Sequence, residues 1–133
     1  MTIIEVIKNK KQFLSLLLLA DEQENMIDRY LERGTMYVLN DNGVKAECVV
    51  TDECNGILEI KNIATVPEYQ GKGYAKALID FIVKEYADKY SVLQVGTGDS
   101  PLTVPFYEKC GFVRSHIIPN LSLIHISEPT RPI

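Results

Sequence analysis

The glycine-rich segment from Val66 to Leu78 constrains the fold more than any other part of the sequence. An apolar, β-prone run over residues 57–66 is followed, after residues 67–70, by a turn with Gly71 and Gly73 and a helical apolar pattern over residues 71–90. A strand that turns tightly into a helix leaves the first N–H groups of that helix without intrahelical partners, and the helix dipole adds positive potential there. The segment therefore predicts a receptor for an anion such as a pyrophosphate.

Two better-known phosphate loops are excluded by spacing. No G-x-x-x-x-G-K-[ST] sequence is present. The pair Gly71 and Gly73 lacks the third glycine of the dinucleotide fingerprint, because Lys76 stands in that place, and the pair Gly96 and Gly98 fails in the same way at Pro101. From these residues alone, a tight turn without a ligand is about as well supported as a phosphate site.

The remaining pattern predicts one mixed α/β domain, since a chain of 133 residues leaves no room for two independent cores. Strands and helices do not alternate strictly, so a doubly wound sheet is not expected. Further strands are predicted over residues 2–7, 35–39, 44–50, 91–95 and 112–118, and further helices over residues 10–20, 21–33 and 100–110.

The strand over residues 57–66 has an irregular pattern. Leu58 and Ile60 share one face, but Asn62 occupies the next position on that face and Ile63 arrives one residue late. Such a slip is typical of a β-bulge. A strand buried on both sides, with one polar residue, explains it equally well.

Composition indicates which binding partners and which cellular compartment to expect. The net charge is −4, with no basic face, so nucleic acid is not expected as a partner. The three cysteines lack C-x-x-C spacing, which favours a cytoplasmic location and predicts no metal site. The apolar run over residues 13–20 is too short to span a bilayer and lacks a signal-peptide context, so no membrane association is expected.

Two motifs resemble those of the GNAT superfamily of acetyl-CoA-dependent N-acetyltransferases. Gln70, Gly73 and Ala75 satisfy its acetyl-CoA signature [QR]-x-x-G-x-[GA], and residues 106–112 resemble its F-Y-x-x-x-G-F segment. This resemblance covers roughly residues 3–119. It implies a mixed, mostly antiparallel twisted sheet flanked by helices, a bulge in the fourth strand, and fourth and fifth strands that splay apart to admit the pantetheine arm.

The resemblance also implies a cofactor site for acetyl-CoA as co-substrate. Main-chain groups of Ile63 and Thr65 would pair with the pantetheine amides, and Gln70 would begin the pyrophosphate loop. The backbone N–H groups that hold the pyrophosphate would be those of Gly71, Lys72, Gly73, Tyr74 and Ala75. Ser100 stands where many members have an asparagine, so its direct bond to the cofactor is in doubt, although serine still caps a helix.

Two residues are candidates for the chemistry. Tyr107 lies where the family commonly places a tyrosine that protonates the departing thiolate, and a phenol with an ordinary pKa of about 10 suits that task. Its alternative role is a core aromatic beside Phe106. Glu59 lies eleven positions before Gln70, where some members of the family have a glutamate that serves as the general base for the acceptor amine. Its alternative role is an outward-facing strand glutamate opposite a lysine.

We therefore expect an acyl-CoA N-acyltransferase that transfers an acetyl group to a primary amine by direct attack in a ternary complex. A backbone N–H would stabilise the oxyanion. The acceptor is a small-molecule or peptide amine that the sequence does not identify, and a homodimer is compatible with the family. The alternative is a non-catalytic acyl-CoA-binding sensor, which would need the loop but neither Glu59 nor Tyr107.

The C-terminal segment resembles a sequence that is not part of the natural protein. Residues 121–131 resemble, codon by codon, the translation of a transposon-type sequencing adapter. We therefore interpret residues 1–120 as a C-terminally truncated GNAT domain that lacks its authentic final strand, and residues 121–133 as a non-native tail. The alternative is a genuine strand, because residues 121–126 alternate and are β-prone.

Overall fold

The chain is a mixed α/β fold with a mostly antiparallel sheet, as predicted. The computed structural model describes residues 1–95, 103–117 and 127–132. The chain divides into two compact units. The N-terminal unit comprises Met1–Thr51 and Lys61–Ile82, and the C-terminal unit comprises Asp52–Ile60 and Val83–Ile133.

The first three strands of the N-terminal unit pair in antiparallel fashion. β1 (Thr2–Val6) pairs with β2 (Thr35–Asn40), and β2 pairs in turn with β3 (Val44–Asp52). β4 (Ile57–Thr65) follows β3 in the strand order. The β2–β3 turn contains Asn42 and Gly43 at φ angles of 55° and 108°, and an Asn-Gly pair is typical of such a hairpin turn because both residues adopt positive φ at low cost.

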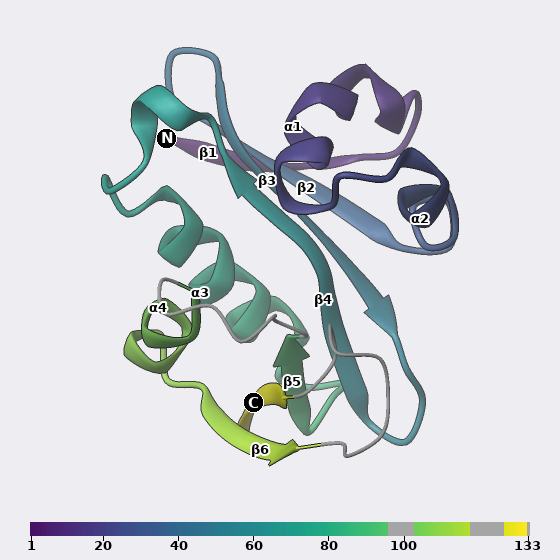
Figure 1. Ribbon diagram of the computed structural model, residues 1–133, viewed down its shortest axis with the longest axis vertical. Helices are drawn as coiled ribbons and strands as arrows, with labels where there is room; N and C mark the ends of the chain where they lie inside the picture. The colour runs from purple at the N-terminus through teal and green to yellow at the C-terminus, as the bar shows by residue number, and fades with distance from the viewer. Residues whose placement is uncertain (96–102, 118–126, 133) are drawn as a thin grey trace. The chain divides into compact units, whose positions relative to one another are not determined.

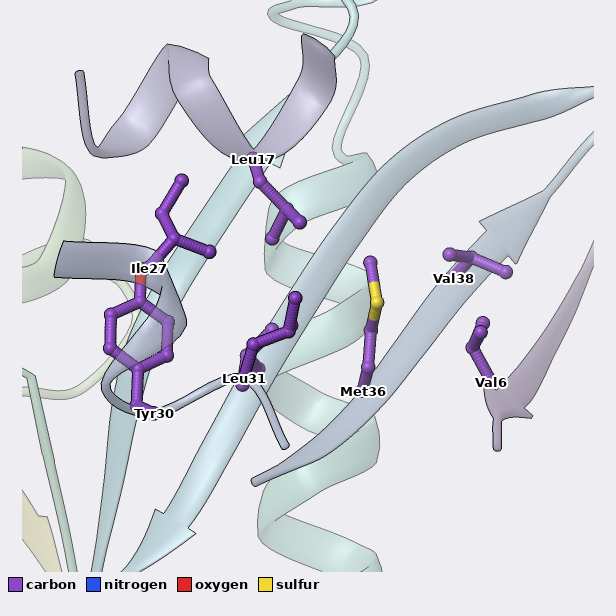
Figure 2. Packing of buried hydrophobic residues seen from close by; sticks show 8 residues of the cluster. Val6, Leu17, Ile27, Tyr30, Leu31, Met36 and Val38 are labelled. Carbon is purple, nitrogen blue, oxygen red and sulfur yellow. The ribbon is translucent and has the colours of Figure 1, made fainter. Parts of the chain in front are cut away.

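Helices cover both faces of the N-terminal strands. The 3₁₀ helix η1 (Lys10–Phe13), α1 (Leu14–Ala20) and α2 (Glu24–Asp28) lie over one face, and α3 (Tyr74–Tyr86) lies behind the other (Figures 1 and 2). Successive side chains of β2 contact the helices on its two faces in turn. Met36 and Val38 belong to the cluster under α1 and α2, whereas the ring of Tyr37 meets that of Phe81 from α3 at 5.0 Å.

The apolar core under α1 and α2 holds this layer together. Side chains from β1, α1, α2 and β2 converge in Figure 2, where the labelled residues point toward one another. The buried members are Val6, Leu17, Ile27, Tyr30, Leu31, Met36, Val38 and Val49. Lys10 is buried beside this layer, where its Nζ donates to the carbonyl oxygens of Leu31 and Gly34 at 2.9 and 2.8 Å.

The strands of the C-terminal unit are joined by one parallel and two antiparallel pairings. Ile57–Ile60 of β4 pairs in parallel with β5 (Val92–Val95). β7 (Ser127–Pro132) is antiparallel both to β5 and to β6 (Val113–Ile117), and α4 spans Thr103–Lys109. β7 therefore comes from the segment that we interpret as an adapter, while the predicted pairing of residues 121–126 lies outside the described residues. The absence of the authentic final strand stays a prediction.

Several helices are shorter than predicted. The helix expected over residues 21–33 is α2 alone, because Gln23 is extended and the chain forms turns after Asp28. The helix expected from residue 71 begins at Tyr74, because Gly71 and Gly73 have positive φ. In the described part of the chain, no helix is long and apolar enough to cross a membrane.

The burial of residues along β4 can be compared with the irregular apolar pattern of residues 57–66. Leu58, Ile60, Asn62 and Ala64 are all buried, and the residues between them are half-buried. Helices cover both faces of these strands, so this burial pattern fits either alternative, and the bulge stays a prediction. The pairing of β4 with β5 ends at Ile60 and Val95, and the predicted splay beyond this point involves residues 96–102, outside the described residues.

Candidate functional site

The glycine-rich turn of the N-terminal unit has the predicted strand–turn–helix form. β4 ends at Thr65, a short 3₁₀ helix η2 (Pro67–Tyr69) follows, and Gln70 is extended. Gly71 and Gly73 have φ angles of 81° and 88°, a region that residues with a Cβ rarely adopt. The two glycines are therefore required by the backbone of this turn.

The space in front of the helix is open at both glycines. A Cβ built at Gly71 or Gly73 meets no heavy atom within 4 Å. The first intrahelical bond of α3 runs from the N–H of Ala77 to the carbonyl oxygen of Gly73 at 3.0 Å. Helix geometry leaves the N–H groups of Tyr74, Ala75 and Lys76 without acceptors in the helix, so they are available to an anion.

The predicted cofactor residues of the loop are held by local contacts. The Nε2 of Gln70 lies 3.5 Å from the carbonyl oxygen of Thr65, and Ile63 and Thr65 are half-buried on β4. The hydroxyl of Tyr74 donates to Oδ2 of Asp41 at 2.7 Å. This hydrogen bond, with some burial and the charge of Asp41, raises the pKa of Tyr74 and ties the start of α3 to the β2–β3 turn.

Two ammonium groups lie beside the loop. The Nζ of Lys45 is 4.1 Å from the ring centroid of Tyr69, and the Nζ of Lys72 is 5.7 Å from the same centroid. Both distances suit cation–π attraction. The loop therefore combines unpaired N–H groups with nearby positive charge, which is the chemistry that binds phosphate.

Glu59 lies in the C-terminal unit, on the part of β4 that pairs with β5. The register places Gln94 directly opposite Glu59, and the Nε2 of Gln94 donates to Oε1 of Glu59 at 2.6 Å. Glu59 is half-buried. Its carboxylate is thus held in a fixed position and remains partly accessible, as a general base would require.

Tyr107 is a buried residue of α4 in the C-terminal unit. Its ring meets those of Phe106 and Phe112 edge to face, at centroid distances of 5.3 and 5.6 Å. These contacts fit the core-aromatic role and also fix the direction of the ring. Ser100, predicted as a cofactor contact, lies outside the described residues.

Comparison with known proteins identifies the family. Residues 32–114 match the family described as "Acetyltransferase (GNAT) domain". The chain is also 33% identical, over 120 residues, to the uncharacterized N-acetyltransferase YvbK of Bacillus subtilis (strain 168), covering 88% of this chain and 77% of that protein. The chain belongs to the GNAT acetyltransferase family. This confirms the resemblance seen in the two motifs and makes the protein an acyl-CoA N-acyltransferase.

Solved GNAT structures share the fold along nearly the whole chain. The IAA acetyltransferase from Bacillus cereus ATCC 14579 is 30% identical with a TM-score of 0.81, covering 99% of this chain and 100% of that one. A GNAT family acetyltransferase from Elizabethkingia anophelis, solved with acetyl-CoA bound, is 26% identical with a TM-score of 0.84, covering 99% and 97%. These two GNAT relatives confirm the predicted fold class.

Sequence reasoning missed a buried carboxyl group in this GNAT domain. The alternating pattern over residues 44–50 is typical of a half-buried strand with Glu47 on its solvated face, but β3 is buried from Ala46 to Thr51 and Glu47 is 0% exposed. The reason is that helices cover both faces of this strand. Val49, an apolar residue on the same face as Glu47, was the signal that this face is also covered.

No metal site is evident among the residues the structure describes. Cys48, Cys54 and Cys110 are all free, and no group of three or more potential ligands comes together in the described ranges. Cys48 and Cys110 are buried, whereas Cys54 is exposed. Burial and the nearby charge of Glu47 raise the pKa of the Cys48 thiol, which makes it a poor nucleophile.

Proposed function

We propose that the protein transfers an acetyl group from acetyl-CoA to a primary amine by direct attack in a ternary complex. The observation that carries this proposal is the open, positive-φ turn at Gly71 and Gly73 in front of α3. The relative from Elizabethkingia anophelis, solved with acetyl-CoA bound, supports the choice of co-substrate. A cytoplasmic location, consistent with the three free cysteines, belongs to the same proposal.

The cofactor contacts come mainly from the main chain. Backbone N–H groups from Gly71 to Ala75, including those of Lys72 and Tyr74, would hold the pyrophosphate, and Gln70 would begin the loop. Main-chain groups of Ile63 and Thr65 would pair with the pantetheine amides. The vacant space at each glycine fits a phosphate group, since a Cβ would project into it. Ser100 is a further proposed contact and lies outside the described residues.

Glu59 and Tyr107 have the two proton-transfer roles in this proposal. An amine is mostly protonated at neutral pH, so Glu59 would accept a proton from it, directly or through water, before it attacks the thioester carbon. A backbone N–H would stabilise the oxyanion, and the hydroxyl of Tyr107 would donate its proton to the departing thiolate. The hydrogen bond from Gln94 to Glu59 would orient the base.

A thiol-release assay with acetyl-CoA and a panel of small-molecule and peptide amines tests this function. We expect turnover with at least one amine and none without an acceptor. Glu59→Gln should lower kcat by about 10²- to 10⁴-fold, the usual contribution of general acid–base catalysis. Tight acetyl-CoA binding without turnover of any amine would contradict the proposal, and a fully active Glu59→Gln variant would remove Glu59 from the mechanism.

A further inference from the structure

Three buried oxygen atoms of the N-terminal unit have no hydrogen-bond donor among the described residues. They are Oε1 and Oε2 of Glu47 and Oδ1 of Asn62, whose residues are 0% and 2% exposed. Buried polar atoms are nearly always hydrogen-bonded, because leaving one unpaired costs its desolvation energy. The arrangement therefore points to a donor that binds here.

The two side chains lie in the layer covered by α1 and α2. The Nδ2 of Asn62 donates to the carbonyl oxygen of Leu17 and to the hydroxyl of Tyr30, both at 3.0 Å. Glu47 shares a face of β3 with Val49, which packs in the same cluster as Leu17 and Tyr30. Burial, with contributions from the charges of Asp21 and Glu47, raises the pKa of Tyr30 to about 12.

Polar groups extend from this layer toward the surface. The hydroxyl of Tyr30 donates to Oδ2 of Asp21 at 3.3 Å, which is long for an O–H···O bond, and Asp21 is half-buried. Asp21 connects α1 to α2, two short helices. The carboxylate of Asp21 is therefore the partly exposed end of this group of polar side chains.

The surroundings of the oxygen atoms are otherwise apolar. The buried cluster of this layer contains Leu17, Ile27, Leu31 and Val49, and Figure 2 shows the first three, from α1, α2 and the turn after α2. Burial alone raises the pKa of Glu47 well above its ordinary value. Such an environment favours an apolar stem on the bound molecule and disfavours a second charged group close to its donor.

We propose that Glu47 and Asn62 bind the amino group of the acceptor, and that the acceptor is a primary amine carried on an apolar stem. An ammonium group supplies N–H donors and the positive charge that the carboxyl group of Glu47 lacks as a partner among the described residues. Asn62 also directly precedes Ile63, whose main chain is a proposed pantetheine contact. Binding requires α1 and α2 to move apart. This inference rests on the proposed acetyl transfer.

The first test compares two amines and needs no variant. Thiol release from acetyl-CoA is measured with n-butylamine and with 4-aminobutanoate, which differ by a carboxylate at the end of the same short stem. We expect kcat/KM to be about 100-fold or more higher for n-butylamine, since burying a carboxylate costs several kcal/mol. Equal rates, or a preference for 4-aminobutanoate, would overturn the inference.

The second test is the isosteric substitution Glu47→Gln. Loss of one partner of a buried charge pair should raise KM for n-butylamine by about 30-fold or more, with a smaller change in kcat and an unchanged Kd for acetyl-CoA. The matched control is Glu22→Gln, an exposed carboxylate near the same helices, which should leave all three values unchanged.

Thermal melts and KM values of two Glu47 variants together distinguish a role in binding the amine from a role in packing. If Glu47 only fills space, Glu47→Leu and Glu47→Gln should melt at the wild-type temperature or above it and retain the wild-type KM, and that result would overturn the inference. Acetylation of other amines without any of n-butylamine would overturn it as well, while leaving acetyl transfer intact. Failure to bind acetyl-CoA or to acetylate any amine would instead contradict the proposed function itself.

Discussion

Gly73 allows cofactor binding to be tested apart from folding. Its φ of 88° and the open space around a Cβ mean that a substitution strains the backbone, by about 1–2 kcal/mol, without a steric clash. Gly73→Glu would place a negative charge where the pyrophosphate is proposed to bind, so we expect acetyl-CoA binding to be lost while the fold persists. Calorimetry measures the binding, and circular dichroism measures the fold.

Gly73→Lys is the matched control for that substitution. It imposes the same backbone strain and a similar bulk but carries the opposite charge, so it should weaken binding much less than Gly73→Glu. An unchanged acetyl-CoA affinity in Gly73→Glu would be incompatible with the phosphate-loop assignment.

Tyr107→Phe distinguishes the two roles of that tyrosine. The substitution keeps the ring that packs against Phe106 and Phe112 and removes only the hydroxyl. If the hydroxyl protonates the thiolate, kcat should fall by about 10²- to 10⁴-fold, with a smaller change in KM for acetyl-CoA. Steady-state kinetics measure both, and a variant with wild-type kcat would leave Tyr107 as a core aromatic.

At the scale of an element, only one side of α1 packs in the core and contributes to stability. Leu17 is 0% exposed in the cluster with Met36 and Val38, whereas Leu19 on the same helix is 51% exposed. Leu17→Ala should therefore lower the free energy of unfolding by about 2–5 kcal/mol, while Leu19→Ala should change it by less than about 0.5 kcal/mol. Urea denaturation measures both, and similar losses in the two variants would show that α1 is not packed as described.

At the scale of the whole molecule, the strand β7 is a poor central strand. Ser127–Pro132 lies between β5 and β6 in the strand order, yet Pro129 and Pro132 have no N–H to donate to either neighbour. The interpretation of residues 121–133 as adapter-derived stays a prediction.

Two altered chains test how much β7 contributes to stability by thermal melting. Truncation after Asn120 removes β7 and leaves backbone groups of β5 and β6 unpaired, so we expect a lower Tm. Pro129→Thr restores one donor and should raise the free energy of unfolding by about 0.5–1.5 kcal/mol if that donor finds an acceptor. Finding residues 121–133 in an independently sequenced genomic copy would refute the adapter interpretation.

The sequence by itself determined the features that depend on local backbone chemistry. Residue type explains the positive φ of Gly71 and Gly73 and the hairpin at Asn42 and Gly43, because glycine and asparagine adopt such angles at low cost. The order of the predicted strands and helices indicates the mixed α/β class. Only the tertiary structure decided which polar groups are buried. Glu47 lies on a strand whose pattern predicts a solvated face, and helices distant in sequence exclude water from it. Burial depends on what packs against a residue, and the sequence around that residue does not contain this information.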